Sequence, residues 1–449
     1  MADSVKAQTT ELKREFNLLD TTMISVGSMI GSGIFLVPAS IALFVHSPSW
    51  SIAAWVIGGI VSLFGALSIA ELGTMYPNAG GLYVYLKEAY GSLWGFLYGW
   101  SAFAVIRTAS ISAVAVGFAT YLGYFIPLSP IGISSVAIIS IILLTLINSL
   151  GVKSGAIVQN VLTIIKIGTL AVIALLGVFF GSSANFSSIT GIEIPLANMA
   201  GPFGLALVAV LWAYDGWIQT TFVAGEVKEP QKNIPRALII STLLVIFVYV
   251  TVNLSYMAIL SIDRIAQSTL VLSDAVTVVV GTTGAALAAI AVIISTLGCN
   301  NGLVLAPARI YYAMSKENLF FKRLALVHSK FGTPIQSLIL QGIWACLLVL
   351  TGTFEQLITY VVFASWIFYA MAAAAVIILR KNKPELERPY KTWGYPYTPI
   401  IFIIFSTYLV INTLIENPRD SFIGLGLVLL GLPAFYYWNS KIKKSRQIL

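Results

Sequence analysis

The chain has 449 residues, of which 58% are hydrophobic and only 10% are charged. Soluble domains carry about 25% charged residues, so this composition excludes an ordinary soluble protein. Apolar runs reach the roughly 20 residues that a helix needs to cross a bilayer, and they do so about twelve times. The sequence therefore predicts an all-α integral membrane protein in contact with the lipid bilayer. The connections between the runs are too short for a soluble catalytic body.

Twelve transmembrane helices are expected in chain order. The first twenty residues are polar and lack an apolar leader with a cleavage site, so the first helix should stay in the mature protein. We expect a cytoplasmic segment at 1–20, a single transmembrane domain at 21–439 and a basic cytoplasmic tail at 440–449. The predicted spans are 21–45, 51–75, 93–126, 130–150, 155–180, 201–225, 236–260, 284–312, 335–352, 356–379, 396–415 and 421–439.

The lysines and arginines predict the orientation of these spans. With the N-terminus inside, nearly all basic residues outside the spans fall on inner segments, and only Arg264 and Arg419 fall on outer loops. This asymmetry follows the positive-inside rule and predicts a multi-pass protein of the cell inner (plasma) membrane with both termini cytoplasmic. The net charge of +8 is then a consequence of topology, and no nucleic-acid partner is expected.

Metal and cofactor sites are not expected. Cys299 and Cys346 lie inside apolar runs, and His46 and His328 have no partner histidine or cysteine at ligand spacing. An intramembrane hydrolase would need an acid–base or metal constellation at membrane depth, and the sequence contains neither HExxH nor an aspartate pair. A channel would need repeated pore loops. A nutrient sensor with a transporter fold, which would bind without counterflow, stays an alternative.

Two of the predicted spans contain central interruptions. SMIGSGIF at 28–35 interrupts the first span, and LWAYDGW at 211–217 interrupts the sixth, which crosses in the opposite direction. Paired broken helices at corresponding positions of two halves indicate a midplane binding site in a transporter. The alternative for the first stretch is close helix packing by small residues, which we favour for the glycines at 91, 95 and 99.

A broken helix has a specific binding capacity. Its second half begins with free N–H groups and its first half ends with free carbonyls, and in hydrocarbon these groups need a polar cavity or a ligand. The N-terminal end suits a carboxylate, and the carbonyls suit an ammonium group. Two adjacent breaks therefore complement the zwitterionic backbone of an α-amino acid.

Three charged residues lie near the middle of spans: Arg107, Lys166 and Asp215. Each should face the interior and have a partner, because a charge at a helix centre costs at least ~2.5–3.5 kcal/mol. For Arg107 an internal ion pair is one interpretation. Lys166 is expected to act as a fixed cation in place of sodium or as a protonatable site. Asp215 either faces the substrate side chain or caps the second half of helix six. Glu71 and Glu226 are expected to be gate or packing residues.

Seven stretches match a known family in the same order along nearly the whole chain. They are IGSGIF at 30–35, AELGTMYPNAGGLYVYLKEAYG at 70–91, VIRTAS at 105–110, LTIIKIG at 162–168, LWAYDGW at 211–217, GEVKEPQKNIPRAL at 225–238 and RPYKTWGYP at 388–396. In these stretches the chain resembles the L-type amino acid transporters of the amino acid–polyamine–organocation superfamily.

The resemblance implies a leucine-transporter-type fold, with five-plus-five inverted repeats at about 21–180 and 201–379 and two further helices at about 396–439. It also implies alternating access with one-for-one exchange of L-amino acids. The substrate carboxylate would lie on the backbone of Gly31, Ser32, Gly33 and Ile34. The substrate amino group would bind backbone carbonyls of both breaks: those near Met29 and Ile30, and those of Trp212, Ala213 and Asp215, next to Gly216. Trp212 corresponds to an aromatic gate, and Lys166 resembles the lysine that stands where related sodium symporters hold a sodium ion. We expect Lys166 and Arg107 to take part in coupling or conformational change.

Two departures bear on partners and cargo. The animal light subunits carry a cysteine between helices three and four for a heavy subunit, and YFIPLSPIGI at 124–133 has none. A stand-alone transporter of bacterial type, without a disulfide-linked heavy subunit, is therefore expected. The aspartate of AYDGW resembles both bacterial serine/threonine exchangers and animal cystine/dibasic exchangers, so the cargo side chain stays open.

The favoured function is a sodium-independent exchanger of small to mid-sized neutral L-amino acids, and not an enzyme. The alternatives within transport are proton-coupled amino acid uptake through Lys166 and an exchanger that accepts cationic amino acids against Asp215.

Overall fold

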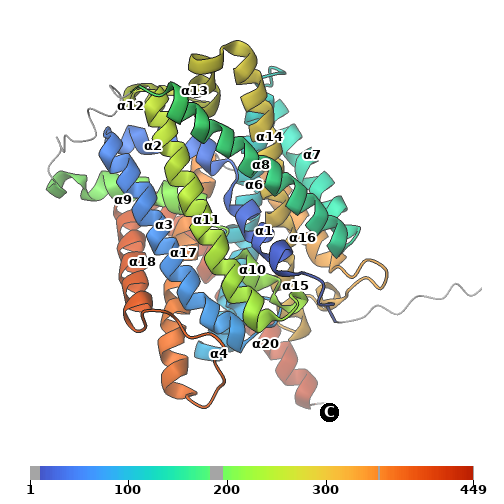
Figure 1. Ribbon diagram of the computed structural model, residues 1–449. Helices are drawn as coiled ribbons and strands as arrows, with labels where there is room; N and C mark the ends of the chain where they lie inside the picture. The colour runs from blue at the N-terminus through green and yellow to red at the C-terminus, as the bar shows by residue number, and fades with distance from the viewer. Residues whose placement is uncertain (1–10, 183–195, 352–353, 448–449) are drawn as a thin grey trace, which may run out of the picture.

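The computed structural model describes residues 11–182, 196–351 and 354–447. These parts of the chain are helical and contain no strand apart from an isolated bridge between Phe16 and Val227. Ten helices are long and apolar enough to cross a membrane, and they stand side by side as a bundle (Figure 1). The prediction of an all-α membrane protein is confirmed.

The helices have the following bounds. They are α1 (Leu18–Met29), α2 (Gly33–Val45), α3 (Pro48–Met75), α4 (Leu82–Tyr90), α5 (Ser92–Ser101), η1 (Ala102–Ile106), α6 (Arg107–Leu122), α7 (Pro130–Ser149), α8 (Val152–Phe180), α9 (Leu196–Tyr214), α10 (Gln219–Phe222), η3 (Ala224–Glu226), α11 (Pro230–Ile259), α12 (Ile262–Gln267), α13 (Val271–Val280), α14 (Thr282–Leu305), α15 (Ala308–Lys316), η4 (Lys322–Ala325), α16 (Ile335–Val349), α17 (Phe354–Asn382), α18 (Tyr397–Glu416), α19 (Pro418–Leu429) and α20 (Gly431–Gln447).

Both predicted interruptions are present. The first span is split into α1 and α2, with residues 30–32 between the two helices, and α1 begins with a capping box between Asn17 and Asp20. The sixth span is split between α9 and α10, at residues 215–218. Glycine has weak helix propensity and no Cβ, so both breaks occur where the sequence contains it.

Two expected spans contain only shorter apolar helices. They are Met199–Tyr214, which precedes the second break, and Ile335–Val349. The third span is one continuous helical stretch in which η1, a π-helix, joins α5 to α6. A single π-turn accommodates an extra residue in an α-helix and often marks a functional position, and Arg107 follows it directly.

The packing interpretation of the three glycines holds for two of them. A Cβ on Gly95 would lie 2.8 Å from the Cβ of Lys87, and one on Gly99 would collide with Met314. For Gly91 the interpretation is wrong, because a Cβ there would meet nothing within 4 Å. Gly91 has a φ of +94° and forms the junction between α4 and α5, where glycine is favoured by its backbone conformation.

Some helices were not predicted. The connection between the seventh and eighth spans contains α12 and α13, and the connection after α3 contains α4. The eighth span is interrupted at residues 306–307, between α14 and α15. Short helices of this kind carry no long apolar run, so hydropathy does not detect them.

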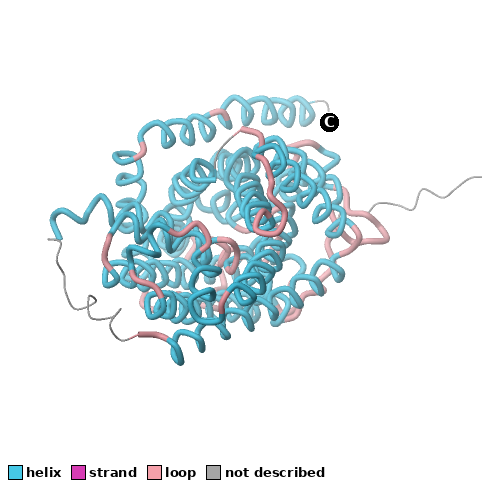
Figure 2. The backbone as a smooth tube through the Cα atoms, turned by 90° about the horizontal axis from the view of Figure 1, so that it is seen from above, coloured by secondary structure: helices cyan, strands magenta, loops and turns pink. Residues whose placement is uncertain are grey.

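The interior of the bundle contains the broken helices. α1 packs against α8, α11 and α14, while α2 packs against α9. Seen from above, the helices surround this centre and the C-terminal α20 lies at the edge (Figure 2). Outer helices such as α7 and α8 expose large apolar side chains, including Leu146 and Ile157, whereas polar residues such as Ser25 and Thr220 are buried. This distribution is the one expected for a body surrounded by lipid with a polar centre.

Candidate substrate site

The two breaks cross with direct backbone contact, and two glycines make this approach possible. A Cβ on Gly33 would lie 2.7 Å from the Cβ and 2.9 Å from the Cα of Ala213. Gly216, with a φ of +152°, faces the backbone at the end of α1, and a Cβ there would lie 2.7 Å from the Met29 nitrogen. Any side chain at these positions would separate the two broken helices.

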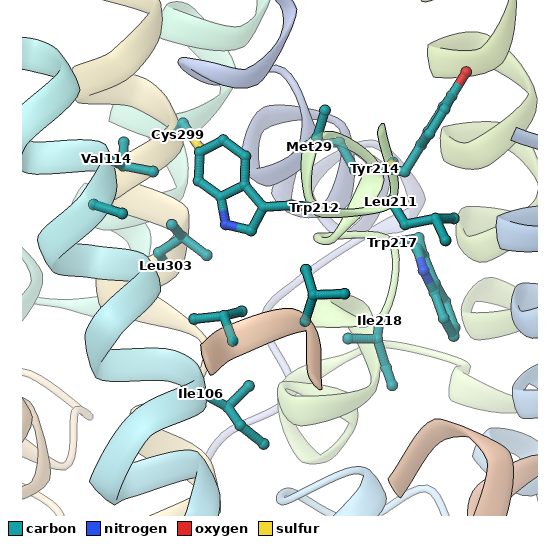
Figure 3. Packing of buried hydrophobic residues seen from close by; sticks show 14 of the residues in the cluster. Met29, Ile106, Val114, Leu211, Trp212, Tyr214, Trp217, Ile218, Cys299 and Leu303 are labelled. Atoms are coloured by element: carbon teal, nitrogen blue, oxygen red, sulfur yellow. The ribbon is translucent and has the colours of Figure 1, made fainter. Parts of the chain in front are cut away.

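A small cavity lies beside this crossing. Its wall comes from both breaks and from α6 and α14. The indole of Trp212 extends across the cavity toward α6 and α14, where Val114 and Leu303 lie (Figure 3). The lining residues are Ser28, Met29, Gly31, Ser32, Gly33, Ser110, Val114, Trp212, Ala213, Asp215, Cys299 and Leu303. Most residues predicted for the site are therefore brought together at one cavity.

The start of α2 supplies donors without partners. Within the described chain, no hydrogen bond uses the backbone amides of Gly31, Ser32, Gly33 or Ile34. The Ser32 hydroxyl is buried and also unpartnered, and it does not cap α2. Free amides and the positive end of a helix dipole at a cavity wall form a site for an anion such as a carboxylate.

The carbonyls expected to take an amino group are partly engaged within the protein. The Tyr249 hydroxyl of α11 lies 2.6 Å from the Met29 carbonyl and 3.1 Å from that of Ala213, so it bridges the two breaks. The Trp212 carbonyl accepts from the Asp215 amide at 3.0 Å. A carbonyl oxygen has two lone pairs and can accept a second bond. Tyr249 was missed, because a tyrosine in an apolar run gives no sequence signal of its partner.

Lys166 of α8 is bound to the end of α1. Its Nζ donates to the carbonyls of Gly27 and Ile30, at 2.7 Å each, and the side chain is completely buried. These carbonyls are free because α1 ends at the break. The Lys166 side chain therefore ties α8 to the carbonyls that α1 leaves free at the break.

Arg107 and Asp215 form an ion pair. Arg107 Nη1 donates to Asp215 Oδ2 at 2.8 Å, and Nη2 donates to the Tyr369 hydroxyl at 2.6 Å. Tyr369 in turn donates to Asp215 Oδ1 at 2.5 Å. The internal-ion-pair interpretation of Arg107 is confirmed. The interpretation of Asp215 as a cap is wrong, since α10 has no side-chain cap and both carboxylate oxygens bind other partners.

Glu71 lies near the C-terminal end of α3, and Glu226 lies in η3. The C-terminal end of α3 lies toward the same end of the bundle as α4, α15 and α20 (Figure 1). Arg309 binds Glu226 through Nε and Nη2 at 2.6 and 2.9 Å. Arg380 binds Glu71 in the same bidentate way, at 2.8 and 2.7 Å. The Glu226 carbonyl accepts from the Phe16 amide at 2.9 Å, which fixes the segment before α1. Charged pairs and backbone bonds therefore tie the elements together at this end.

A cavity between two broken helices, inside a body of membrane-crossing helices, is the arrangement of a membrane transport protein. Residues 16–429 match the amino acid permease family. The chain is 35% identical over 429 residues to the serine/threonine exchanger SteT of Bacillus subtilis. The aligned region covers 95% of this chain and 97% of that protein. It is 31% identical over 462 residues to the human b(0,+)-type amino acid transporter 1, covering 98% and 92% of the two chains.

A third relative is the large neutral amino acids transporter small subunit 2 of Mus musculus, which is 34% identical over 449 residues, covering 96% of this chain and 83% of that one. The chain belongs to the amino acid permease family of the amino acid–polyamine–organocation superfamily. It is an amino acid transporter and not an enzyme.

Proposed function

We propose that the protein is a sodium-independent exchanger of small to mid-sized neutral L-amino acids, and that it works by alternating access in the plasma membrane. The observation that carries this proposal is the Lys166 ammonium, held by the carbonyls of Gly27 and Ile30 directly beside the break. A permanent cation at that point replaces the charge that a bound sodium ion would supply. The name of the serine/threonine exchanger relative supports exchange and small neutral cargo.

Each half of the substrate backbone has a proposed position. The carboxylate would bind the free amides of Gly31, Ser32, Gly33 and Ile34, which begin α2. The amino group would bind the carbonyls at the end of α1 and of α9. The acceptors proposed for it are the carbonyls of Met29, Ile30, Trp212, Ala213 and Asp215, with Gly216 allowing their approach.

Two further roles follow from position. Trp212 would act as the gate, because its indole covers the cavity beside the crossing (Figure 3). Lys166 and Arg107 would couple substrate binding to the conformational change, because each ties a break to a neighbouring helix. Lys166 extends from α8 to α1, and Arg107 extends from α6 to the break at Asp215. Movement of either broken helix must therefore stretch one of these contacts.

The proposed architecture has twelve spans, in two inverted repeats of five at 21–180 and 201–379 and two further helices at 396–439. The ten long helices, the two shorter ones and the two breaks support it. The domain layout of 1–20, 21–439 and 440–449 goes with this arrangement. Both ends of the described chain lie toward the same end of the bundle (Figure 1), and the basic residues favour the cytoplasm for that end.

We also propose that the transporter needs no disulfide-linked heavy subunit. Its two cysteines lie within α14 and α16, where Cys299 is buried in the cavity wall and Cys346 is partly buried. Neither position suits a covalent bond to a partner outside the membrane.

Uptake into proteoliposomes tests this function. Labelled serine should enter vesicles preloaded with unlabelled serine, and entry should be unaffected by removing sodium or by a proton gradient. Uptake into empty vesicles that depends on an inward proton gradient would favour proton-coupled transport and refute exchange. A competition panel that includes arginine and cystine would show whether cationic cargo is accepted.

A further inference from the structure

The cluster of Arg107, Asp215 and Tyr369 joins three separate elements at the cavity. Arg107 begins α6, Asp215 lies in the second break and Tyr369 lies in α17. All three contacts of the triangle are present, at 2.8, 2.6 and 2.5 Å. The side chain of Arg107 is 0% exposed and that of Asp215 is 7% exposed. A closed triangle of this kind positions both charges rigidly.

One member of the cluster, Asp215, lines the cavity. It is the only carboxylate among the described lining residues. Ser110 and Val114, which follow Arg107 by one and two turns on α6, line it too. The wall therefore contains one negative charge, and Arg107 neutralises it from behind.

We propose that Arg107 is a specificity-determining residue: as the internal counter-ion of Asp215 it makes the cavity wall neutral and so restricts the cargo to neutral amino acids. The proposal rests on the transport function proposed above. A buried pair that loses one member leaves an uncompensated charge, which is strongly unfavourable. A cargo side chain of the missing sign would remove that penalty. Without Arg107 the site should accept cationic amino acids, and without Asp215 it should accept acidic ones.

The Arg107 guanidinium also has donors available to bind an acidic cargo side chain if Asp215 is removed. Its Nε is buried without a hydrogen-bond partner in the described chain, and the Phe222 ring lies 5.2 Å from Cζ. Removal of the Asp215 carboxylate would free Nη1, so that the guanidinium would contain two donors without partners. A buried guanidinium with free donors is suited to bind the side-chain carboxylate of glutamate or aspartate.

The test measures charge selectivity in reconstituted exchange of labelled serine. For Arg107→Gln, the arginine concentration that halves serine exchange should fall by about tenfold or more, the size of one charge-assisted hydrogen bond. For Asp215→Asn, the glutamate concentration that halves serine exchange should fall by about the same factor. The double variant R107Q/D215N contains neither charge and should respond to neutral competitors alone.

Two controls separate selectivity from damage. Arg107→Lys keeps the positive charge and should still exclude arginine as cargo. Arg264→Gln removes a cation from the exposed surface of α12 and should leave the panel unchanged. Tyr369→Phe keeps both buried charges and loses only the hydroxyl, so it remains informative if the single charge variants do not fold. Loss of the hydroxyl should weaken the pairing of Arg107 with Asp215, so the arginine concentration that halves serine exchange should fall by about threefold.

The outcomes differ for the two proposals. If folded Arg107→Gln and Asp215→Asn exchange serine with an unchanged competitor panel, Arg107 has only a structural role and the inference is overturned. If the two charge variants do not fold, an unchanged competitor panel for Tyr369→Phe overturns the inference as well. If the wild-type protein does not exchange neutral amino acids at all, the proposed function itself fails.

Discussion

A methyl group added at Gly33 provides a sharp test of the backbone crossing. In Gly33→Ala the new Cβ would lie 2.7 Å from the Cβ of Ala213 and 2.9 Å from its Cα. Favourable carbon contacts lie at about 3.5–4.0 Å, so the two broken helices would have to separate by about 1 Å. The Ala213 Cα belongs to the backbone that leads into the second break, so no rotamer change can relieve the contact.

Overpacking of this kind costs about 1–3 kcal/mol, which corresponds to a change of about 5- to 150-fold in an equilibrium constant. We therefore expect serine exchange by Gly33→Ala to fall by about tenfold or more in proteoliposomes, with a larger loss for Gly33→Val. Gly168 of α8 is a matched control, because a Cβ there would meet nothing within 4 Å. Gly168→Ala should exchange normally. Normal exchange by Gly33→Ala would refute the close backbone crossing.

Three further variants test other contacts. Lys166→Ala should lower the exchange rate by at least about tenfold, while serine binding, measured by thermal shift, should change less; an unchanged rate would make Lys166 purely structural. Tyr249→Phe removes the one hydroxyl hydrogen that two carbonyls share and should cost about 1 kcal/mol, seen as a lower Tm; an unaltered Tm would contradict the bridge between the breaks. Glu226→Gln leaves Arg309 buried with an unpaired charge and should cost about 3–5 kcal/mol, whereas Glu229→Gln, in an exposed pair with Lys232, should leave the Tm unchanged; equal Tm values for the two would show that the buried pair adds no stability.

Much of the fold follows from the sequence, because a bilayer imposes simple rules. Every backbone group inside hydrocarbon must be bonded internally, so long apolar runs become helices whose lengths can be read directly. The breaks at 30–32 and 215–218 were predictable for the same reason, since glycine and polar residues inside such runs need an explanation. Elements without a long apolar run, such as α12 and α13, were not predictable.

The candidate site was only partly predictable. The break residues and the three intramembrane charges are unusual for a membrane helix and were identified individually. The pairing of Arg107 with Asp215 spans 108 positions, and sequence spacing does not encode a contact between separate helices. Tyr249, Tyr369, Cys299 and Leu303 resemble any apolar or aromatic residue of a span, so their places at the site were missed.

By itself the sequence determined that this is a helical membrane protein with two glycine-containing breaks and buried charges in need of partners, because chain composition and the bilayer fix those properties locally. Only the tertiary structure decided which face of each helix meets the cavity. It joined Lys166 to the end of α1, placed Tyr249 between two carbonyls and neutralised Asp215 with Arg107. These contacts depend on how separate helices pack, and packing is a property of the whole bundle.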